Sequence, residues 1–195
     1  MRTIRVAQHV SLDGIIQPAE PANAPAYIHG GWMVSYRTPE GAAAFARFYA
    51  QPFDLLLGRR TYDLWAGFWP TMPAGPFATP LNAATKYVVT HRPKDLAWGP
   101  VATLGDDAWE GIRRLRASDG PDLIVCGSGT VARALLERDW VDELVLAVYP
   151  LVLGRGTRAF PGEPLTRTFE LVRSQATPTG VLLNVHRRVG ERTAD

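Results

Sequence analysis

The 195-residue sequence has a single cysteine, Cys126, and almost no net charge. One cysteine cannot form a disulfide within the chain or supply a multi-cysteine zinc site, so a reducing compartment is allowed. The four histidines never recur at i, i+3 or i+4, so no metal-binding histidine pair lies on one helix face, and we expect no metal. The 21 basic and 19 acidic residues leave a net charge of +2, which argues against nucleic acid as a partner.

Long apolar segments are also missing. The longest run lies between Glu143 and Arg155, has eleven residues and contains Pro150. A bilayer-spanning helix needs about 20 apolar residues, so this run is too short to cross a membrane. No N-terminal stretch resembles a signal peptide. We therefore expect a cytoplasmic protein without a membrane partner.

The composition that is present indicates one folded domain. Hydrophobic residues make up 46% of the chain and charged residues 21%, as in globular proteins. At about 150 residues per domain, a chain of this length predicts a single domain over residues 1–195.

Short apolar segments alternate with helical segments along the chain. We expect strands at 3–10, 53–57, 86–90, 101–104, 123–126 and 144–149, helices at 38–50, 58–66, 106–117 and 129–138, and a C-terminal hairpin of strands 168–176 and 181–188. Residues 17–38 and 67–80 are rich in proline and glycine and are predicted to be loops. This order predicts an α/β fold with a mixed, mostly parallel sheet covered on both faces.

Two predicted strands are followed by positively charged turns. Gly58-Arg59-Arg60-Thr61-Tyr62 opens a helix after one strand, and Thr90-His91-Arg92 follows the next. In open parallel sheets, ligands bind beyond the carboxyl ends of the strands. A helix N-terminus with arginine suits a phosphate. A solvated arginine patch and a polar turn are the alternatives.

A third strand end carries a glycine-rich turn, Gly127-Ser128-Gly129-Thr130-Val131-Ala132. The pattern G-x-G-x-x-A between a strand and a helix is typical of pyrophosphate binding, although a tight turn alone also explains it. The next strand ends at Val148-Tyr149-Pro150 without the acid that a Rossmann site needs, so we expect a different α/β fold. Together the three turns suit NADPH, which has a pyrophosphate and an additional monoester phosphate.

These motifs resemble the dihydrofolate reductase fold family. They resemble most closely the C-terminal reductase domain of the bacterial riboflavin-biosynthesis enzyme (the RibD C-terminal domain) and its stand-alone relatives. The resemblance covers nearly the whole chain and includes Ser11-Leu12-Asp13-Gly14, the three turns above, Val141-Asp142-Glu143-Leu144, Pro150 and Leu153-Gly154. It implies a three-layer fold with a mixed sheet of about eight strands, and often a homodimer.

The resemblance implies NADPH-dependent hydride transfer to a small pteridine, aminopyrimidine-like, carbonyl or imine substrate. Cofactor contacts are expected from Ile16, Gly58, Arg59, Arg60, Thr61, Thr90, His91, Arg92, Gly127, Ser128, Gly129, Thr130 and Val131. One alternative is a non-catalytic NADP(H)-binding protein. Another is the 5-amino-6-(5-phosphoribosylamino)uracil reductase of riboflavin biosynthesis, without the zinc deaminase domain whose ligands the sequence lacks.

The candidate catalytic residue is Asp13, beside the expected nicotinamide position, where it orients a substrate ring or supplies a proton; a turn residue before Gly14 is the alternative. Trp32 is a candidate lid over a planar substrate or a packing residue in its loop. Glu40 is a candidate acid or a helix-terminus charge, and Arg155 is a candidate contact for a substrate phosphate.

One aromatic stripe is assigned to packing. Tyr62, Trp65 and Trp69 recur at i, i+3 and i+7 and are expected to face the core.

Overall fold

A computed structural model of the chain describes residues 1–18, 31–160 and 166–190, so residues 19–30 of the predicted 17–38 loop lie outside the described residues. The strands are β1 (Ile4–Ser11), β2 (Ile15–Pro18), β3 (Phe53–Gly58), β4 (Lys86–Val89), β5 (Val101–Ala102), β6 (Asp122–Cys126), β7 (Glu143–Tyr149), β8 (Gly156–Arg158), β9 (Phe169–Ala176) and β10 (Leu182–Arg188).

The α-helices are α1 (Pro39–Ala46), α2 (Arg59–Ala66), α3 (Ala78–Ala83), α4 (Ala108–Ala117) and α5 (Gly129–Glu137). Three short 3₁₀ helices, η2 (Gly31–Tyr36), η3 (Arg47–Tyr49) and η4 (Trp69–Thr71), complete the described helices. None of these helices is long and apolar enough to cross a membrane.

The main sheet has eight strands in the order β5-β4-β3-β6-β1-β7-β10-β9. The first six strands in this order run parallel, while β10 pairs antiparallel with both β7 and β9. This arrangement is the mixed, mostly parallel sheet of the dihydrofolate reductase fold, and the predicted C-terminal hairpin is confirmed. Because the parallel strands share a direction, the turns that follow β3, β4 and β6 emerge at one edge of the sheet.

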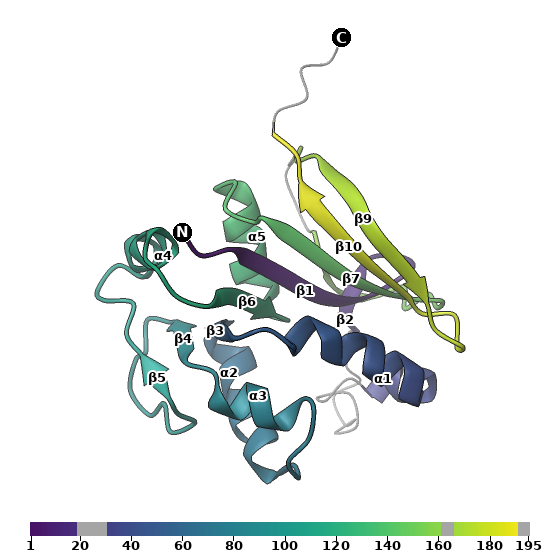
Figure 1. Cartoon of the computed structure of the whole chain (residues 1–195), viewed down its shortest axis with the longest axis horizontal. Helices are drawn as coiled ribbons and strands as arrows, with labels where there is room; N and C mark the ends of the chain where they lie inside the picture. The colour runs from purple at the N-terminus through teal and green to yellow at the C-terminus, as the bar shows by residue number, and fades with distance from the viewer. Residues whose placement is uncertain (19–30, 161–165, 191–195) are drawn as a thin grey trace.

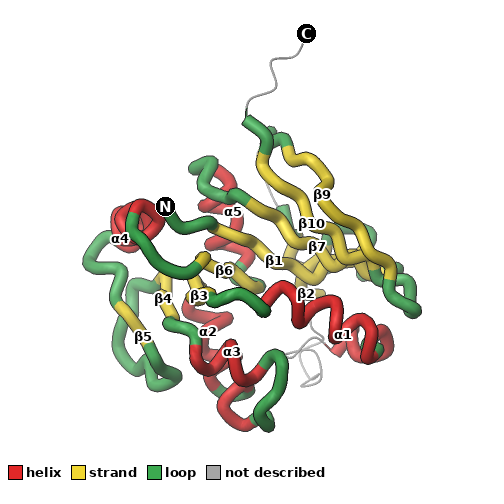
Figure 2. The backbone as a smooth tube through the Cα atoms, in the orientation of Figure 1, coloured by secondary structure: helices red, strands yellow, loops and turns green. Residues whose placement is uncertain are grey.

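Helices cover both faces of the sheet (Figures 1 and 2). On one face, Ile112 of α4 and Leu135 of α5 pack against Val125 of β6. On the other face, Tyr62 of α2 and Leu81 of α3 belong to a second core cluster. The buried side chains of β1 alternate between these clusters because successive side chains of a strand point to opposite faces. Consequently the odd-numbered residues of β1 face α1, α2 and α3.

The start of α1 is capped by Thr38, a residue type that suits a helix N-terminus. Thr38 Oγ1 accepts the N–H of Gly41 at 3.0 Å, and Pro39 occupies the first helical position. The α-helical geometry ends at Ala46 and continues as the 3₁₀ helix η3, so the predicted helix is divided into two types.

The structure corrects two predictions made from composition. The segment predicted as a loop over 67–80 contains η4 and the beginning of α3, and the described part of the segment predicted as a loop over 17–38 contains η2 and the end of β2. Pro80 is the third residue of α3, within the first turn, where a missing N–H breaks no helical hydrogen bond. In addition, β2 and β8 form a small antiparallel sheet that the sequence did not predict, because each strand is only four and three residues long.

Candidate active site

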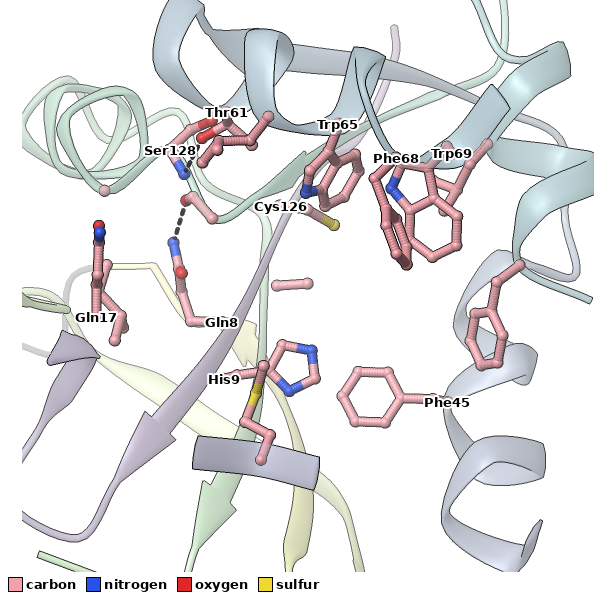
Figure 3. A pocket seen from close by; sticks show the side chains of 18 of the residues that line it. Gln8, His9, Gln17, Phe45, Thr61, Trp65, Phe68, Trp69, Cys126 and Ser128 are labelled. Atoms are coloured by element: carbon pink, nitrogen blue, oxygen red, sulfur yellow. Dashed lines mark hydrogen bonds between the residues drawn. The ribbon is translucent and has the colours of Figure 1, made fainter. Parts of the chain in front are cut away.

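The arginine-containing turn after β3 and the glycine turn after β6 are joined by two hydrogen bonds. The N–H of Gly58 donates to Ser128 Oγ at 3.0 Å. The N–H of Ser128 donates to Thr61 Oγ1 at 3.1 Å (Figure 3). The N-termini of α2 and α5 therefore lie side by side, although Gly58 and Ser128 are 70 residues apart in the sequence. This is the convergence that the sequence predicted for a shared anionic ligand.

The turn after β4 is attached to the same edge through Arg59. Its Nη1 donates to the carbonyl oxygens of Arg92 at 2.6 Å and Lys94 at 2.8 Å, and its Nε donates to Asp63 at 2.8 Å. Thr90 Oγ1 accepts the N–H of Arg92 at 2.9 Å, which closes the turn. Most donors of Arg59 are therefore used to order the protein itself.

Arg60 is placed differently from Arg59. It is exposed, lines the cavity described below and has no hydrogen bond or ion pair to any described residue. In contrast, Thr90, His91 and Arg92 are absent from the described lining of that cavity. Of the predicted basic contacts, Arg60 is the one that lines the described cavity and makes no hydrogen bond or ion pair to a described residue.

The glycine turn holds two consecutive residues in the left-handed region, Gly127 with φ +56° and Ser128 with φ +47°, joined by a trans peptide. A non-glycine residue there costs about 1 kcal/mol or more, so the surrounding structure must hold Ser128 in place. The first hydrogen bond of α5 runs from the N–H of Ala132 to Ser128 O. The N–H groups of the first helical turn, from Gly129 on, are consequently left for another acceptor.

Two side chains of the N-terminal segment pack on the glycine turn. Gln8 Nε2 donates to Gly127 O at 2.6 Å. A Cβ added to Gly129 would lie only 2.9 Å from Ile16 Cδ1, so the missing side chain of Gly129 makes room for Ile16. The structure thus places the predicted contact Ile16 at the turn, and it adds Gln8, which the sequence analysis missed.

These turns open onto a cavity of about 890 Å³ on the α1, α2 and α3 side of the sheet. Eleven of the predicted site residues belong to its described lining: Ile16, Trp32, Gly58, Arg59, Arg60, Thr61, Gly127, Ser128, Gly129, Thr130 and Val131. Figure 3 shows the rings of Trp65, Phe68 and Trp69 along one wall, across from His9 and Phe45. Such a size and aromatic lining are typical of a site for a cofactor or a small planar molecule.

The aromatic stripe of α2 and η4 has two roles. Tyr62 is buried in the core as predicted. Trp65 and Trp69 pack against the same core cluster, also as predicted, and in addition line the cavity. The periodicity identified the helix face correctly, yet it could not distinguish a packed core from a cavity wall, because both are apolar.

His9 is a titratable group in the cavity wall that the sequence analysis did not select. Its Nδ1 lies 2.8 Å from the hydroxyl of Tyr149, and its ring stacks on Phe45 with centroids 4.7 Å apart. Desolvation, assisted by the nearby charge of Arg37, lowers the pKa of His9 to about 4. Burial raises the pKa of Tyr149 to about 12. Both groups are therefore neutral at pH 7.

The thiol of Cys126 also borders the cavity, but it is expected to be unreactive. Burial raises the pKa of Cys126 to about 12, and its Sγ lies 3.2 Å from the hydroxyl of Tyr49. A thiol with so high a pKa is a poor nucleophile at neutral pH.

The Asp13 carboxylate joins the turn after β1 to the 153–154 loop by hydrogen bonds and does not face the cavity. Its oxygens accept the N–H groups of Leu153 at 3.0 Å and Gly154 at 2.8 Å and the hydroxyl of Ser11 at 2.6 Å. These hydrogen bonds, led by the one from Ser11, lower the pKa of Asp13 to about 2. Asp13 is absent from the described cavity lining, so this geometry supports the turn interpretation and gives no support to the catalytic one.

Of the three remaining predicted substrate contacts, Trp32 lines the described cavity and the other two do not. Trp32 is 8% exposed and packs edge-on against Tyr149 at 4.9 Å, so it forms part of the cavity wall instead of a lid. Glu40 is exposed in the first turn of α1, where its charge complements the helix N-terminus. Glu40 and Arg155 are both absent from the described cavity lining.

Comparisons with known proteins agree with the fold and the family resemblance described above. A family model described as the RibD C-terminal domain matches residues 2–183. The chain is 26% identical over 151 residues to the "Uncharacterized protein YwjB" of Bacillus subtilis (strain 168), covering 77% of this chain and 78% of YwjB. It is 23% identical over 146 residues to "Uncharacterized protein YyaP" of the same strain, covering 73% of this chain and 77% of YyaP.

A solved structure shares the fold. The crystal structure of a "putative riboflavin biosynthesis protein" from Shewanella sp. PV-4 superposes with a TM-score of 0.71 at 20% identity, covering 96% of this chain and 99% of that one. At this identity the similarity establishes the architecture alone.

Proposed function

The chain belongs to the RibD C-terminal domain family, and from this premise we propose that it is an NADPH-dependent reductase of a small heterocyclic, carbonyl or imine substrate. Domains of this family are in general reductases of the NADPH-binding type. The observation that carries the proposal is the direct hydrogen bonding of the α2 and α5 N-termini beside one large aromatic cavity.

The residues at this edge fit the phosphate groups of NADPH. The free N–H groups at the start of α5 and the positive end of its helix dipole suit a pyrophosphate. Arg60, exposed and without a described partner, suits the additional monoester phosphate. Thr61 Oγ1 accepts one hydrogen bond from Ser128 and keeps its own proton to donate.

The cavity beyond the glycine turn suits the nicotinamide ring, which gives up the hydride, and the substrate ring that accepts it. When bound, NADPH supplies a hydride. The protein has to hold the acceptor ring flat, exclude water and provide a proton. The side chains of Trp65, Phe45 and Trp32 supply flat apolar surfaces for the first two tasks.

Reduction of a phosphoribosylaminopyrimidine is the specific alternative for the substrate. It is supported by the family description and by the name of the Shewanella neighbour, which refers to riboflavin biosynthesis. A non-catalytic NADP(H)-binding protein is the other alternative. This alternative is favoured if the protein binds NADPH but does not oxidise it with any pteridine, aminopyrimidine or quinone-like acceptor.

The proposal is tested by comparing NADPH with NADH. Titrations followed by tryptophan fluorescence are expected to show tighter binding of NADPH, and Arg60→Ala should reduce the difference by about tenfold. This estimate takes one charge-assisted hydrogen bond of roughly 1.5 kcal/mol, the low value suited to an exposed arginine.

Two further variants serve as controls in this titration. Arg47→Ala removes an exposed arginine outside the described cavity lining and should leave the preference unchanged. Arg59→Ala should weaken NADPH and NADH equally, because Arg59 orders the turn after β4. Equal affinity of the wild-type protein for both dinucleotides contradicts the phosphate assignment.

A further inference from the structure

A tyrosine and a histidine form a hydrogen-bonded pair in the cavity wall. His9 lies on β1 and Tyr149 ends β7, the neighbouring parallel strand, in which Tyr149 pairs with Ser11 and Ala147 pairs with His9. Both side chains project to the face of the sheet that bears the cavity, and both line it. The register therefore brings Nδ1 of His9 within 2.8 Å of the Tyr149 hydroxyl although the residues are 140 positions apart.

The rings of this pair are held on several sides. Phe45 of α1 stacks on His9 with an interplanar angle of 10°. Trp32 and Tyr36 of η2 contact the Tyr149 ring edge-on, with centroids at 4.9 Å and 5.5 Å. Contacts that fix the ring planes also fix the direction of the Tyr149 hydroxyl.

The hydroxyl of Tyr149 keeps unused hydrogen-bonding capacity. A tyrosine hydroxyl has one donor and two acceptor positions. Among the described residues, His9 is its hydrogen-bond partner. When His9 donates from Nδ1, the Tyr149 proton is free to be donated to a molecule in the cavity.

The charges beside the pair are positive. Among the described lining residues, the charged side chains are those of Arg37, Arg59 and Arg60. Arg37 is exposed, and its positive charge lowers the pKa of both groups: at His9 it adds to the effect of burial, and at Tyr149 it opposes the effect of burial. A positive field next to a hydroxyl donor stabilises negative charge that develops on a nearby oxygen.

We propose that Tyr149 is the catalytic proton donor of the reductase, that His9 is its positioning residue, and that the substrate is a planar conjugated ring with a carbonyl oxygen facing Tyr149 and Arg37. This inference rests on the proposed function, which supplies the hydride. A hydroxyl donor beside an arginine suits a substrate atom that accepts a hydrogen bond and gains negative charge in the reaction, and a carbonyl oxygen is such an atom. The pair therefore favours the carbonyl class among the substrates considered above.

The step balances in atoms and electrons. The carbonyl carbon gains a hydride from the reduced dinucleotide, and the electrons of the C=O π bond move to the oxygen. That oxygen takes the proton of Tyr149 and becomes a hydroxyl. The phenolate left on Tyr149 is stabilised by the Nδ1–H of His9 and by the field of Arg37, and it then takes a proton from water.

Binding in the absence of cofactor tests the recognition half of the inference. The probes are 1,4-naphthoquinone, which has carbonyl oxygens, and naphthalene, which has the same ring without them, each followed by tryptophan fluorescence. Tyr149→Phe should weaken naphthoquinone binding by about tenfold, the value of one hydrogen bond, and leave naphthalene binding unchanged. An equal effect on both probes, or none on naphthoquinone, overturns the recognition.

Turnover tests the proton transfer. With NADPH and naphthoquinone, Tyr149→Phe should lower kcat by about 100-fold or more while the affinity for NADPH stays at the wild-type value. Tyr87→Phe is the matched control, because it removes a hydroxyl on β4 outside the described cavity lining. Wild-type kcat in Tyr149→Phe overturns the role of Tyr149.

The positioning role of His9 is tested independently of Tyr149→Phe. His9→Leu should lower kcat, and His9→Asn, which keeps an N–H donor near the Nδ1 position, should restore most of it. Equal kcat in the two variants contradicts the positioning role. If the wild-type protein does not bind NADPH, the proposed function itself fails; if it binds NADPH but neither binds nor reduces naphthoquinone, only the present inference fails.

Discussion

At the scale of the residue, Lys86 shows how a single buried charge is accommodated. It is fully buried in β4, where Nζ donates to the carbonyl oxygens of Asn82 at 2.6 Å and Gly99 at 3.0 Å. Nζ also lies 4.3 Å from the centre of the Trp98 ring, a cation–π contact. These contacts do not fully replace water, and burial lowers the pKa of Lys86 from 10.5 to about 8.

This pKa predicts a pH dependence of stability. Between pH 8 and 10.5 the unfolded chain holds the Lys86 proton while the folded chain has released it, so the unfolding free energy rises with pH in this window. Urea denaturation should therefore show the stability of the wild-type protein rising relative to Lys86→Met from about pH 8 upward. Lys94→Met, an exposed lysine, serves as the control and should parallel the wild type. If the unfolding free energies of the wild type and of Lys86→Met change with pH in parallel, the pKa of Lys86 is not lowered.

At the scale of the element, α4 depends on a glycine for its close approach to the segment before it. A Cβ added to Gly111 would lie 2.0 Å from the carbonyl oxygen of Leu104 and 2.7 Å from its carbonyl carbon. Backbone atoms cannot move aside as a flexible side chain can. The helix therefore packs at a distance that only a glycine at position 111 permits.

Gly111→Ala should lower the unfolding free energy by about 1–3 kcal/mol, the usual cost of overpacking. Gly67→Ala is the matched control, because Gly67 has a right-handed conformation and its added Cβ would approach no atom closer than 3.8 Å. That control should change stability by no more than about 0.5 kcal/mol. Denaturant unfolding of both variants checks the difference, and equal stabilities would show that α4 moves away easily.

At the scale of the whole molecule, the sheet has one exposed apolar edge. Leu171 and Val172 of the edge strand β9 are 58% and 46% exposed, and Leu182 of β10 is 41% exposed. Exposed apolar side chains gathered in one place favour association with another surface, and in β9 they lie between the exposed charges of Glu170 and Arg173. The homodimer implied by the family resemblance stays a prediction, and we propose this edge as its interface.

Light scattering should give the mass of a dimer for the wild-type protein and of a monomer for Leu171→Glu. Leu12→Glu introduces the same charge at a leucine that is 63% exposed in the turn after β1, and it should remain dimeric. A monomeric wild-type protein, or a dimer that persists in Leu171→Glu, is the result that contradicts this interface.

The sequence by itself determined the order of the elements and the edge of the sheet at which the candidate binding turns meet. Strand and helix periodicity, the Thr38 cap and the Thr177–Gly180 turn are local signals, and the structure confirms the sheet, the helices on both faces and the C-terminal hairpin. The rule that ligands bind at the carboxyl ends of parallel strands then placed the turns at 58–62 and 127–131 together. The hydrogen bonds between Gly58, Thr61 and Ser128 confirm that placement.

Only the tertiary structure decided which side chains remain available at that edge. Arg59 and Arg60 are equivalent in a sequence motif, yet Arg59 is bound to carbonyl oxygens about 35 residues away while Arg60 stays free of described partners. In the same way, Asp13 is occupied by the N–H groups of the 153–154 loop, and His9 meets Tyr149 across neighbouring strands. The physical reason is that a polar side chain takes its role from the groups that compete for it, and in this fold those groups come from distant parts of the chain.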